Sequence, residues 1–354
     1  LGRAAFEISN NVCSFCILLS FLLYTINIDK CTLKSAVIEK KWLFTPAKTF
    51  AALKNASKKS NKRGFRMLKR NQAVAKYVSV ATLLGCMSAG AHAAAWSDTF
   101  VGYRYGTQFM EPNNPENVEK HILQFTHVSG YSLGQNFFNL DLLQSSNEDP
   151  TSNSDSGATE AYLTYRHQLH AGSVFDEPVA FGPVRDMALT LGFDLNTKNT
   201  GFAPRKRQLV VGPTFKFDVP RGFVDLSLFY SREWNHCGLP PCGLPENQNS
   251  ISFDPYYQIN LAWGLPFEVA ALPLKFQGFY NYNGEKGDDY FGDSTKPEQL
   301  MRTSLMLDVG QVAWGAKNSL WAGVGYEYWR NKFGNHDKPG VDTDAMTLNV
   351  EWHF

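Results

Sequence analysis

Hydrophobic and polar residues alternate along much of the chain after residue 94. The alternation is strictest at the end of the chain, where polar residues separate five apolar ones: Met346, Leu348, Val350, Trp352 and Phe354. Successive side chains of a β-strand point to opposite faces, so this period of two predicts strands with one apolar and one polar face. No run of 18 apolar residues follows Ala95, so no membrane-spanning helix is predicted there.

Six other segments repeat this alternation, at 187–196, 208–217, 224–231, 257–263, 272–281 and 320–329. Less regular strands are expected at 98–109, 119–129, 134–145, 159–170 and 299–310. These segments and the last one make about twelve strands of roughly ten residues, the length that a tilted strand needs to cross a bilayer. The pattern therefore predicts an all-β protein, a transmembrane antiparallel β-barrel.

The connections between the expected strands differ in length. Long polar connections are expected at 110–118, 146–158, 197–205, 233–252, 283–298 and 331–343, and short ones at 130–133, 218–221, 264–270 and 311–317. Long loops on one side and short turns on the other are typical of outer-membrane barrels and argue against a soluble β-sandwich, whose strands also alternate. The connection at 171–184 does not fit this scheme.

Aromatic residues make up 14% of the chain, and many lie near the ends of the expected strands. They suit interfacial girdles: Trp96, Tyr103, Tyr105, Tyr230, Trp263, Tyr280, Tyr282, Tyr328 and Trp352. Charged residues on a membrane strand are costly toward lipid, so those on the strands are expected to point into the lumen. This group comprises Arg166, Asp194, Lys206, Lys216, Asp225, Lys275, Arg302, Asp308, Glu327 and Glu351.

The chain divides into a basic leader and an acidic body. Residues 1–93 carry 15 of the 34 basic and 3 of the 33 acidic residues, which leaves a net charge of −11 for 94–354. From Met67 the chain shows a basic start, an apolar stretch and Ala91-His-Ala93, so 67–93 is predicted to be a signal peptide. A lipobox ending at Cys86 is the alternative. Residues 1–66 are interpreted as an upstream segment from a misassigned start, the alternative being an N-terminal anchor.

Two cysteines of the body lie close together in the segment Cys237-Gly-Leu-Pro-Pro-Cys242. They favour a local disulfide formed in an oxidising compartment over a metal or redox pair, because no second pair of ligands completes a zinc site. No metal and no cofactor are predicted. The acidic body gives no reason to expect nucleic-acid binding.

Several short motifs resemble the nucleoside-specific outer-membrane channels of the Tsx type. The motifs are Phe100–Phe109 followed by Pro112, Phe181–Asp186 leading into Leu191–Leu195, Tyr326–Trp329 and the closing Trp352–Phe354. The resemblance covers 94–354 in layout and implies a twelve-stranded barrel with a narrow pore for nucleosides and deoxynucleosides. It also implies that the outer loops can serve as receptors for phages or bacteriocins. No individual nucleoside-contacting residue is carried over.

The sequence thus predicts an integral outer-membrane channel for facilitated diffusion of small solutes, most of all nucleosides. Bases could stack on inward aromatics and sugar hydroxyls could bond to polar groups. The candidate solute-binding residues are Phe229, Phe279, Trp321, Trp329, Asp194, Asp225, Lys275, Arg302 and Glu327. Structural ion pairing within the lumen is the alternative role for the charged residues.

Two other functional classes remain open. A surface receptor or structural barrel without transport predicts no solute flux. An outer-membrane hydrolase is disfavoured, because the body holds neither a G-x-S-x-G nor an H-E-x-x-H motif, and no enzyme activity is predicted. The expected partners are membrane lipid, lipopolysaccharide, the small solute and the outer-membrane assembly machinery, which would read the last strand ending at Phe354.

Overall fold

The computed structural model of the chain describes residues 94–242 and 249–354. The predicted upstream segment (1–66) and signal peptide (67–93) lie outside these residues. Ala94–Phe354 form one compact unit.

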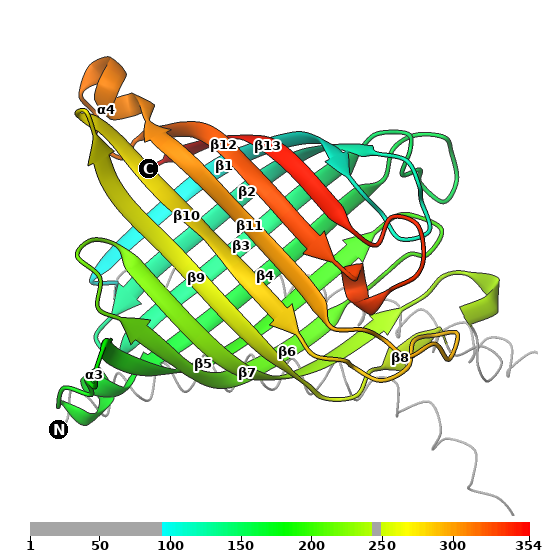
Figure 1. The fold of residues 1–354 in the computed structure, drawn as a ribbon, viewed down its shortest axis with the longest axis horizontal. Helices are drawn as coiled ribbons and strands as arrows, with labels where there is room; N and C mark the ends of the chain where they lie inside the picture. The colour runs from blue at the N-terminus through cyan, green and yellow to red at the C-terminus, as the bar shows by residue number, and fades with distance from the viewer. Residues whose placement is uncertain (1–93, 243–248) are drawn as a thin grey trace, which may run out of the picture. The chain divides into compact units, whose positions relative to one another are not determined.

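This unit is a closed antiparallel barrel (Figure 1). Its twelve long strands are β1 (Trp96–Phe109), β2 (Val118–Tyr131), β3 (Gly134–Ser145), β4 (Thr159–His170), β5 (Val184–Lys198), β6 (Arg207–Phe217), β7 (Phe223–His236), β9 (Tyr256–Val269), β10 (Leu272–Asn283), β11 (Glu298–Asp308), β12 (Leu320–Arg330) and β13 (Thr343–His353). Each pairs with its neighbours in sequence, β7 pairs with β6 and β9, and β1 pairs with β13 to close the ring. The short β8 (Ser250–Ser252) only extends β7. The predicted twelve-stranded barrel is confirmed.

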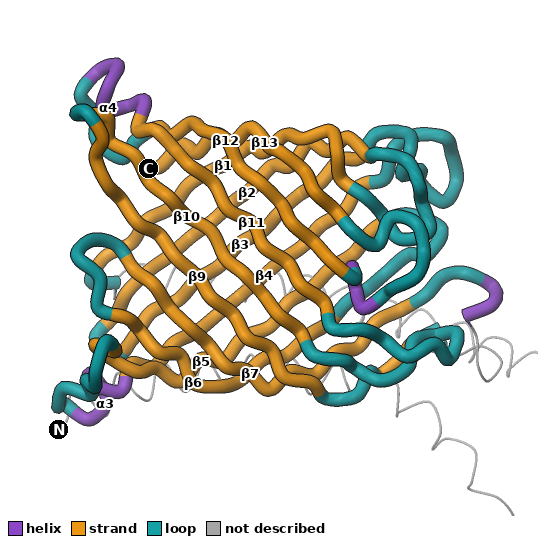
Figure 2. Tube along the Cα trace, viewed as in Figure 1, coloured by secondary structure: helices purple, strands orange, loops and turns teal. Residues whose placement is uncertain are grey.

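The two ends of the barrel are built differently (Figure 2). One end, here the turn end, carries the C-terminus, the tight turns and two short helices, α3 (Ala171–Phe175) and α4 (Val309–Trp314). The other, here the loop end, carries the six long connections, including the turns η2 (Pro240–Cys242) and η3 (Lys332–Gly334). Outer-membrane barrels have short periplasmic turns and long external loops, so the turn end is periplasmic and the loop end faces outward.

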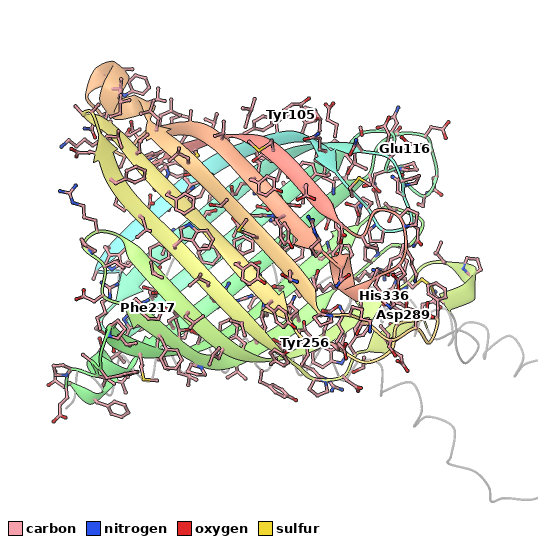
Figure 3. The ribbon with its side chains drawn as sticks, in the orientation of Figure 1. Tyr105, Glu116, Phe217, Tyr256, Asp289 and His336 are labelled. Carbon is pink, nitrogen blue, oxygen red and sulfur yellow. A yellow bond between two sulfur atoms is a disulfide. The ribbon has the colours of Figure 1, made fainter. Side chains whose placement is uncertain are left out.

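The faces of the wall are sorted by polarity. Outward positions on β6 run from Phe217, labelled near the turn end in Figure 3, through Phe215, Pro213 and Val211 to Leu209. Inward positions between them are mostly polar, and Gln208, Thr214 and Lys216 are buried. A closed sheet leaves no unpaired strand edge, so its apolar exterior can face hydrocarbon. The barrel is an integral protein of the outer membrane.

Three details differ from the sequence prediction. β9 continues through the expected connection at 264–270 and ends in a turn of Ala270 and Ala271, whose φ angles are 48° and 64°. Trp263 therefore lies in mid-strand and not at the strand end, and it stacks on Phe276. β11 ends at Asp308, whose side chain accepts a hydrogen bond from the Gln311 N–H and caps α4. No helix among the described residues is long and apolar enough to span a membrane.

Candidate functional site

All nine candidate residues lie on inward positions of the wall. Asp194, Asp225, Phe229, Trp321, Trp329 and Glu327 are buried, whereas Lys275, Phe279 and Arg302 retain partial exposure to the lumen. Strand register sets their directions, since each strand turns alternate residues inward. The inward orientation expected from the alternation is therefore observed. The solute-binding role of these residues stays a prediction.

Four charged side chains meet in the middle of the barrel: Arg104 on β1, Asp141 on β3, Arg302 on β11 and Glu327 on β12. We call them the lumen cluster. Arg302 Nε donates to Glu327 Oε2 at 2.6 Å, and Arg302 Nη1 donates to Asp141 Oδ2 at 3.4 Å. Arg104 Nη2 donates to the same Asp141 oxygen at 3.3 Å. Two cations and two anions thus compensate each other around one point of the lumen.

The Arg302–Asp141 bond crosses the lumen. β3 and β11 lie five places apart around the ring of twelve strands, almost on opposite walls. A circular barrel of twelve strands about 4.8 Å apart, tilted by about 40°, would be roughly 24 Å wide. One arginine and one aspartate side chain are together much shorter than this. The walls that carry β3 and β11 must therefore approach each other, and the lumen is narrowed at this level.

Polar side chains extend the lumen cluster along the wall. Asn139 donates to Asp141 Oδ1 at 2.9 Å and accepts hydrogen bonds from Gln124 and Thr126. On the next strands Arg166 donates to Asp194 Oδ1 at 2.6 Å. These bonds hold the charged groups in fixed positions, as buried ionic groups require.

Two polar atoms in this region have no hydrogen-bond partner. They are Arg104 Nε, a donor, and Asn349 Oδ1, an acceptor, and both are buried. Arg104 and Asn349 lie opposite each other on β1 and β13, and both face inward. The neighbouring inward positions on β12, Gly323 and Gly325, carry no side chain. A free donor and a free acceptor thus lie side by side next to the narrowing.

The four candidate aromatics do not form one site. Phe229 and Phe279 lie near the middle of their strands, and the ring of Phe279 lies 6.0 Å from the Arg302 guanidinium. Trp321 and Trp329 lie at opposite ends of β12, and eight residues of strand separate them by about 27 Å. Among the four, Phe279 is the aromatic with a ring contact to a residue of the lumen cluster.

Two of the candidate charges belong to ion pairs at the turn end. Lys275 Nζ lies 3.3 Å from Glu351 Oε2 and 4.5 Å from the centre of the Trp321 ring. Asp225 accepts a hydrogen bond from Lys216 Nζ at 2.6 Å. The Lys216–Asp225 pair joins the neighbouring strands β6 and β7, and the Lys275–Glu351 pair joins β10 to β13, three places apart in the ring. Such pairing is the structural role that the sequence left open as the alternative.

The loop end carries a second group of charges, which we call the mouth cluster: Glu111, Lys120, Lys198 and Lys332. Glu111, on the β1–β2 loop, bonds to Lys120 of β2, lies 3.1 Å from Lys198 of β5 and accepts a hydrogen bond from Lys332 at 3.1 Å. Burial alone would raise the pKa of Glu111, but the attraction of the three lysines outweighs burial and holds this pKa well below its usual value. The cluster therefore ties two outer loops and two strands together at the mouth.

A third charged group lies across the mouth on β7. Glu233 Oε1 accepts a hydrogen bond from Lys286 of the β10–β11 loop at 2.9 Å, and its Oε2 lies 3.5 Å from Lys206 Nζ. Tyr256, labelled at the loop end of β9 in Figure 3, donates to the same carboxylate at 3.2 Å. Nearby, a disulfide joins Cys237 to Cys242.

Sequence reasoning missed Arg104, Asp141 and Glu111. For Asp141 a signal exists, because it interrupts the apolar run Leu140-Asp-Leu-Leu143, and a charge there must point inward. Arg104 carries the same signal within the first strand. Nothing in the sequence marks Glu111, since it sits in a polar loop.

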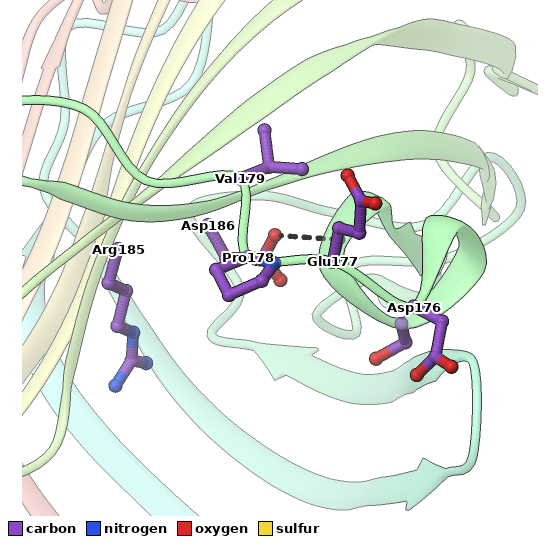
Figure 4. Close-up of a pocket in the computed structure, with 8 residues that line it drawn as sticks. Asp176, Glu177, Pro178, Val179, Arg185 and Asp186 are labelled. Carbon is purple, nitrogen blue, oxygen red and sulfur yellow. Dashed lines mark hydrogen bonds between the residues drawn. The ribbon is translucent and has the colours of Figure 1, made fainter.

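One further depression lies outside the lumen, between α3 and the start of β5 (Figure 4). The irregular connection at 171–184 forms most of it, and at its lining Asp186 Oδ1 accepts a hydrogen bond from the Gly172 N–H at 3.1 Å. Asp176, Glu177 and Arg185 also line it. Among residues 94–242 and 249–354, no three His, Cys, Asp or Glu side chains gather in a way that could hold a metal ion.

No known family model and no curated protein matches the sequence. Among solved structures the chain is similar to the translocator domain of the autotransporter NalP from Neisseria meningitidis, with 13% identity, a TM-score of 0.39 and coverage of 80% of this chain and 98% of that one. It is also similar to an outer membrane channel from Pseudomonas putida F1 (11% identity, TM-score 0.40, coverage 74% and 94%) and to the NanC porin (9%, 0.38, 73% and 99%). These likenesses are too low to carry an argument about function.

Proposed function

We propose that the protein is an outer-membrane channel for the facilitated diffusion of small solutes, and that nucleosides are its preferred substrates. The observation that carries the proposal is the narrowing of the lumen where Arg302 of β11 bonds to Asp141 of β3. A narrowing lined by fixed polar groups limits the size of a solute and supplies groups that can recognise it.

The chemistry of the narrowing suits a flat, uncharged solute. Its two cations and two anions cancel, so the cluster as a whole attracts neither a cation nor an anion over a neutral molecule. Arg104 Nε and Asn349 Oδ1 are a buried donor and a buried acceptor without partners, and a local movement of these side chains would let the edge of a nucleobase pair with both. Phe279 supplies an aromatic face beside them, on which a base could stack.

Liposome swelling tests the proposal directly. Protein reconstituted into liposomes should admit thymidine or adenosine faster than sugars and amino acids of similar size, and nucleoside flux should saturate. Equal flux for all solutes would contradict the nucleoside preference and leave a general diffusion channel. Absence of flux from folded protein would contradict the channel.

Two pairs of variants locate the selective residues. Asn349→Leu should reduce the preference for nucleosides, whereas Val350→Leu, on the outward side of the same strand, should not. Phe279→Leu should act likewise, with outward-facing Phe276→Leu as its control. If the inward and outward variants behave alike, the solute is not recognised at the narrowing.

The second candidate function is that of a surface receptor or structural barrel that transports no solute. The Arg302–Asp141 bond also supports this function. If the Arg302–Asp141 bond never opens, the lumen cluster acts as a plug, and the outer loops alone carry a receptor or structural role. Swelling assays that show no flux from wild-type protein but rapid flux from Arg302→Met would support this candidate.

A further inference from the structure

Three arginines gather on the outer surface of the barrel at the loop end of β6 and β7. Arg207 is the first residue of β6, Arg205 precedes it by two residues, and Arg232 lies on β7. Gln208 and Glu233 are buried in the lumen, so their strand neighbours Arg207 and Arg232 point outward. Lys206, between the first two arginines, turns inward to Glu233. We call the three residues the arginine patch.

No carboxylate among residues 94–242 and 249–354 pairs with the arginine patch. Within the described part of the chain, no carboxylate lies within 4 Å of a guanidinium of Arg205, Arg207 or Arg232, whereas Arg302 and Arg330 on other strands are both paired. Arg232 donates to the Ser252 hydroxyl at 3.1 Å and its guanidinium lies 5.9 Å from the Trp234 ring. Three guanidinium groups thus lie on one surface, and no described carboxylate compensates their charge.

The surface below the patch is ordered in layers toward the membrane centre. Arg207 pairs with Trp234, and Arg232 pairs with Leu209. The next layer holds Tyr230 and Tyr257, which pair with each other and are 58% and 56% exposed. Only apolar side chains follow, including Val211 and Leu228. Tyrosine marks the interface of a membrane barrel, so the arginines lie at the level of the lipid headgroups of the outer leaflet.

We propose that the arginine patch binds the phosphate groups of lipopolysaccharide, with the acyl chains lying on the apolar layer below. Guanidinium groups bind phosphate with two parallel hydrogen bonds and are weakly hydrated, which favours binding at an interface. Arg207 and Arg232 lie diagonally on adjacent strands, about 7–8 Å apart at the backbone, and Arg205 extends the patch outward. This spread suits a lipid with more than one phosphate. The proposal does not depend on the channel function.

Lipid binding to the purified protein in detergent micelles tests the proposal. Native mass spectrometry should show bisphosphorylated lipid A bound to the protein. Dephosphorylated lipid A and phosphatidylglycerol should bind at least about tenfold more weakly, because the loss of one charge-assisted hydrogen bond lowers the affinity by a factor of about ten or more. The variant Arg205→Gln/Arg207→Gln/Arg232→Gln should lose at least about tenfold in affinity for bisphosphorylated lipid A.

The matched control carries the same change in charge at the other end of the barrel. Arg185→Gln/Arg221→Gln/Lys317→Gln alters three exposed cations at the turn end and should bind lipid A as wild type does. Folding of each variant is checked by heat-modifiable migration in gels, and the single variant Arg205→Gln, in a loop, serves if the triple variant does not fold. Equal binding by patch variant and wild type would overturn the proposal, as would equal binding of lipid A and phosphatidylglycerol.

Discussion

Replacing Arg302 by methionine removes the cation that the two opposite walls share. Arg302 is the partner of Glu327 at 2.6 Å and of Asp141 at 3.4 Å, and the side chains of both acids are at most 4% exposed. Methionine keeps an unbranched side chain, shorter than that of arginine, but leaves Glu327 without its nearest cation. Asp141 keeps Arg104 at 3.3 Å.

The size of the effect follows from burial. Removing one partner of a buried ion pair costs about 3–5 kcal/mol, because the remaining charge stays desolvated. Since Arg302 is 24% exposed and Arg104 still compensates Asp141, we expect the lower end, about 3 kcal/mol of unfolding free energy. The double variant Arg302→Met/Glu327→Gln removes both charges of the closest pair and should recover most of this loss.

Two assays read the result. Urea unfolding in micelles measures the free energy of unfolding, and Arg330→Met is the control. The Arg330–Asp344 pair faces outward and is partly exposed, so its loss should cost about 1 kcal/mol or less. Planar-bilayer recordings should show higher conductance for Arg302→Met and a shift toward cations, since the lumen cluster changes from neutral to a net charge of −1. Unchanged conductance in folded Arg302→Met, or a stability loss no larger than that of Arg330→Met, would refute the assignment of the narrowing.

Three further predictions follow from other parts of the barrel. The pKa of Glu111 is lower in the folded protein than in the unfolded chain, where it is about 4.3. Glu111 therefore contributes its full stabilisation above about pH 4.3 and loses it only as the pH falls through the pKa of the folded state. Hydrogen exchange in the β1–β2 loop should therefore stay slow at pH 5. Glu111→Gln should speed this exchange at pH 7, and equal rates would contradict the role of the mouth cluster. Phe354 is 73% exposed, so deleting it should reduce the amount of assembled barrel in cells while changing the unfolding free energy of refolded protein by less than about 1 kcal/mol. A large loss of stability instead would show a packing role. Gly212→Ala places a Cβ 1.9 Å from the Leu228 carbonyl oxygen, between β6 and β7, and should lower the unfolding free energy measured by chemical denaturation by about 1–3 kcal/mol. Gly201→Ala is the control, because the nearest atom to its new Cβ lies 3.7 Å away, and it should leave this free energy unchanged.

Strand positions and the distinction between the two ends could be read from the sequence, because each depends on local patterns. The alternation at 320–329 corresponds to β12 (Leu320–Arg330), and that at 208–217 to β6 (Arg207–Phe217). The exact end of β9 could not, since its turn uses two alanines at positive φ, where sequence signals favour glycine or asparagine. The helix α3 likewise replaces a connection that matched no pattern.

The partners of the lumen charges could not be predicted. Alternation shows that Arg302 points inward, but its contact with Asp141 depends on how far the barrel is flattened, a property of the closed ring and not of any strand. The same limit applies to Glu111, because the folding of a loop over the mouth is not encoded in a periodic pattern. Local sequence therefore gives the direction of a side chain, whereas its partner requires the tertiary structure.

The bonds of the lumen cluster also bear on how the barrel unfolds. Asp141 and Arg302 are 161 residues apart in the chain, and Glu111 and Lys332 are 221 apart. Such distant partners can meet only after β1 and β13 have closed the ring. Interactions that form late stabilise the native state without stabilising the transition state for folding, so their loss speeds unfolding and leaves the insertion rate nearly unchanged. The ion pairs inside the barrel thus set how long it persists once assembled in the membrane.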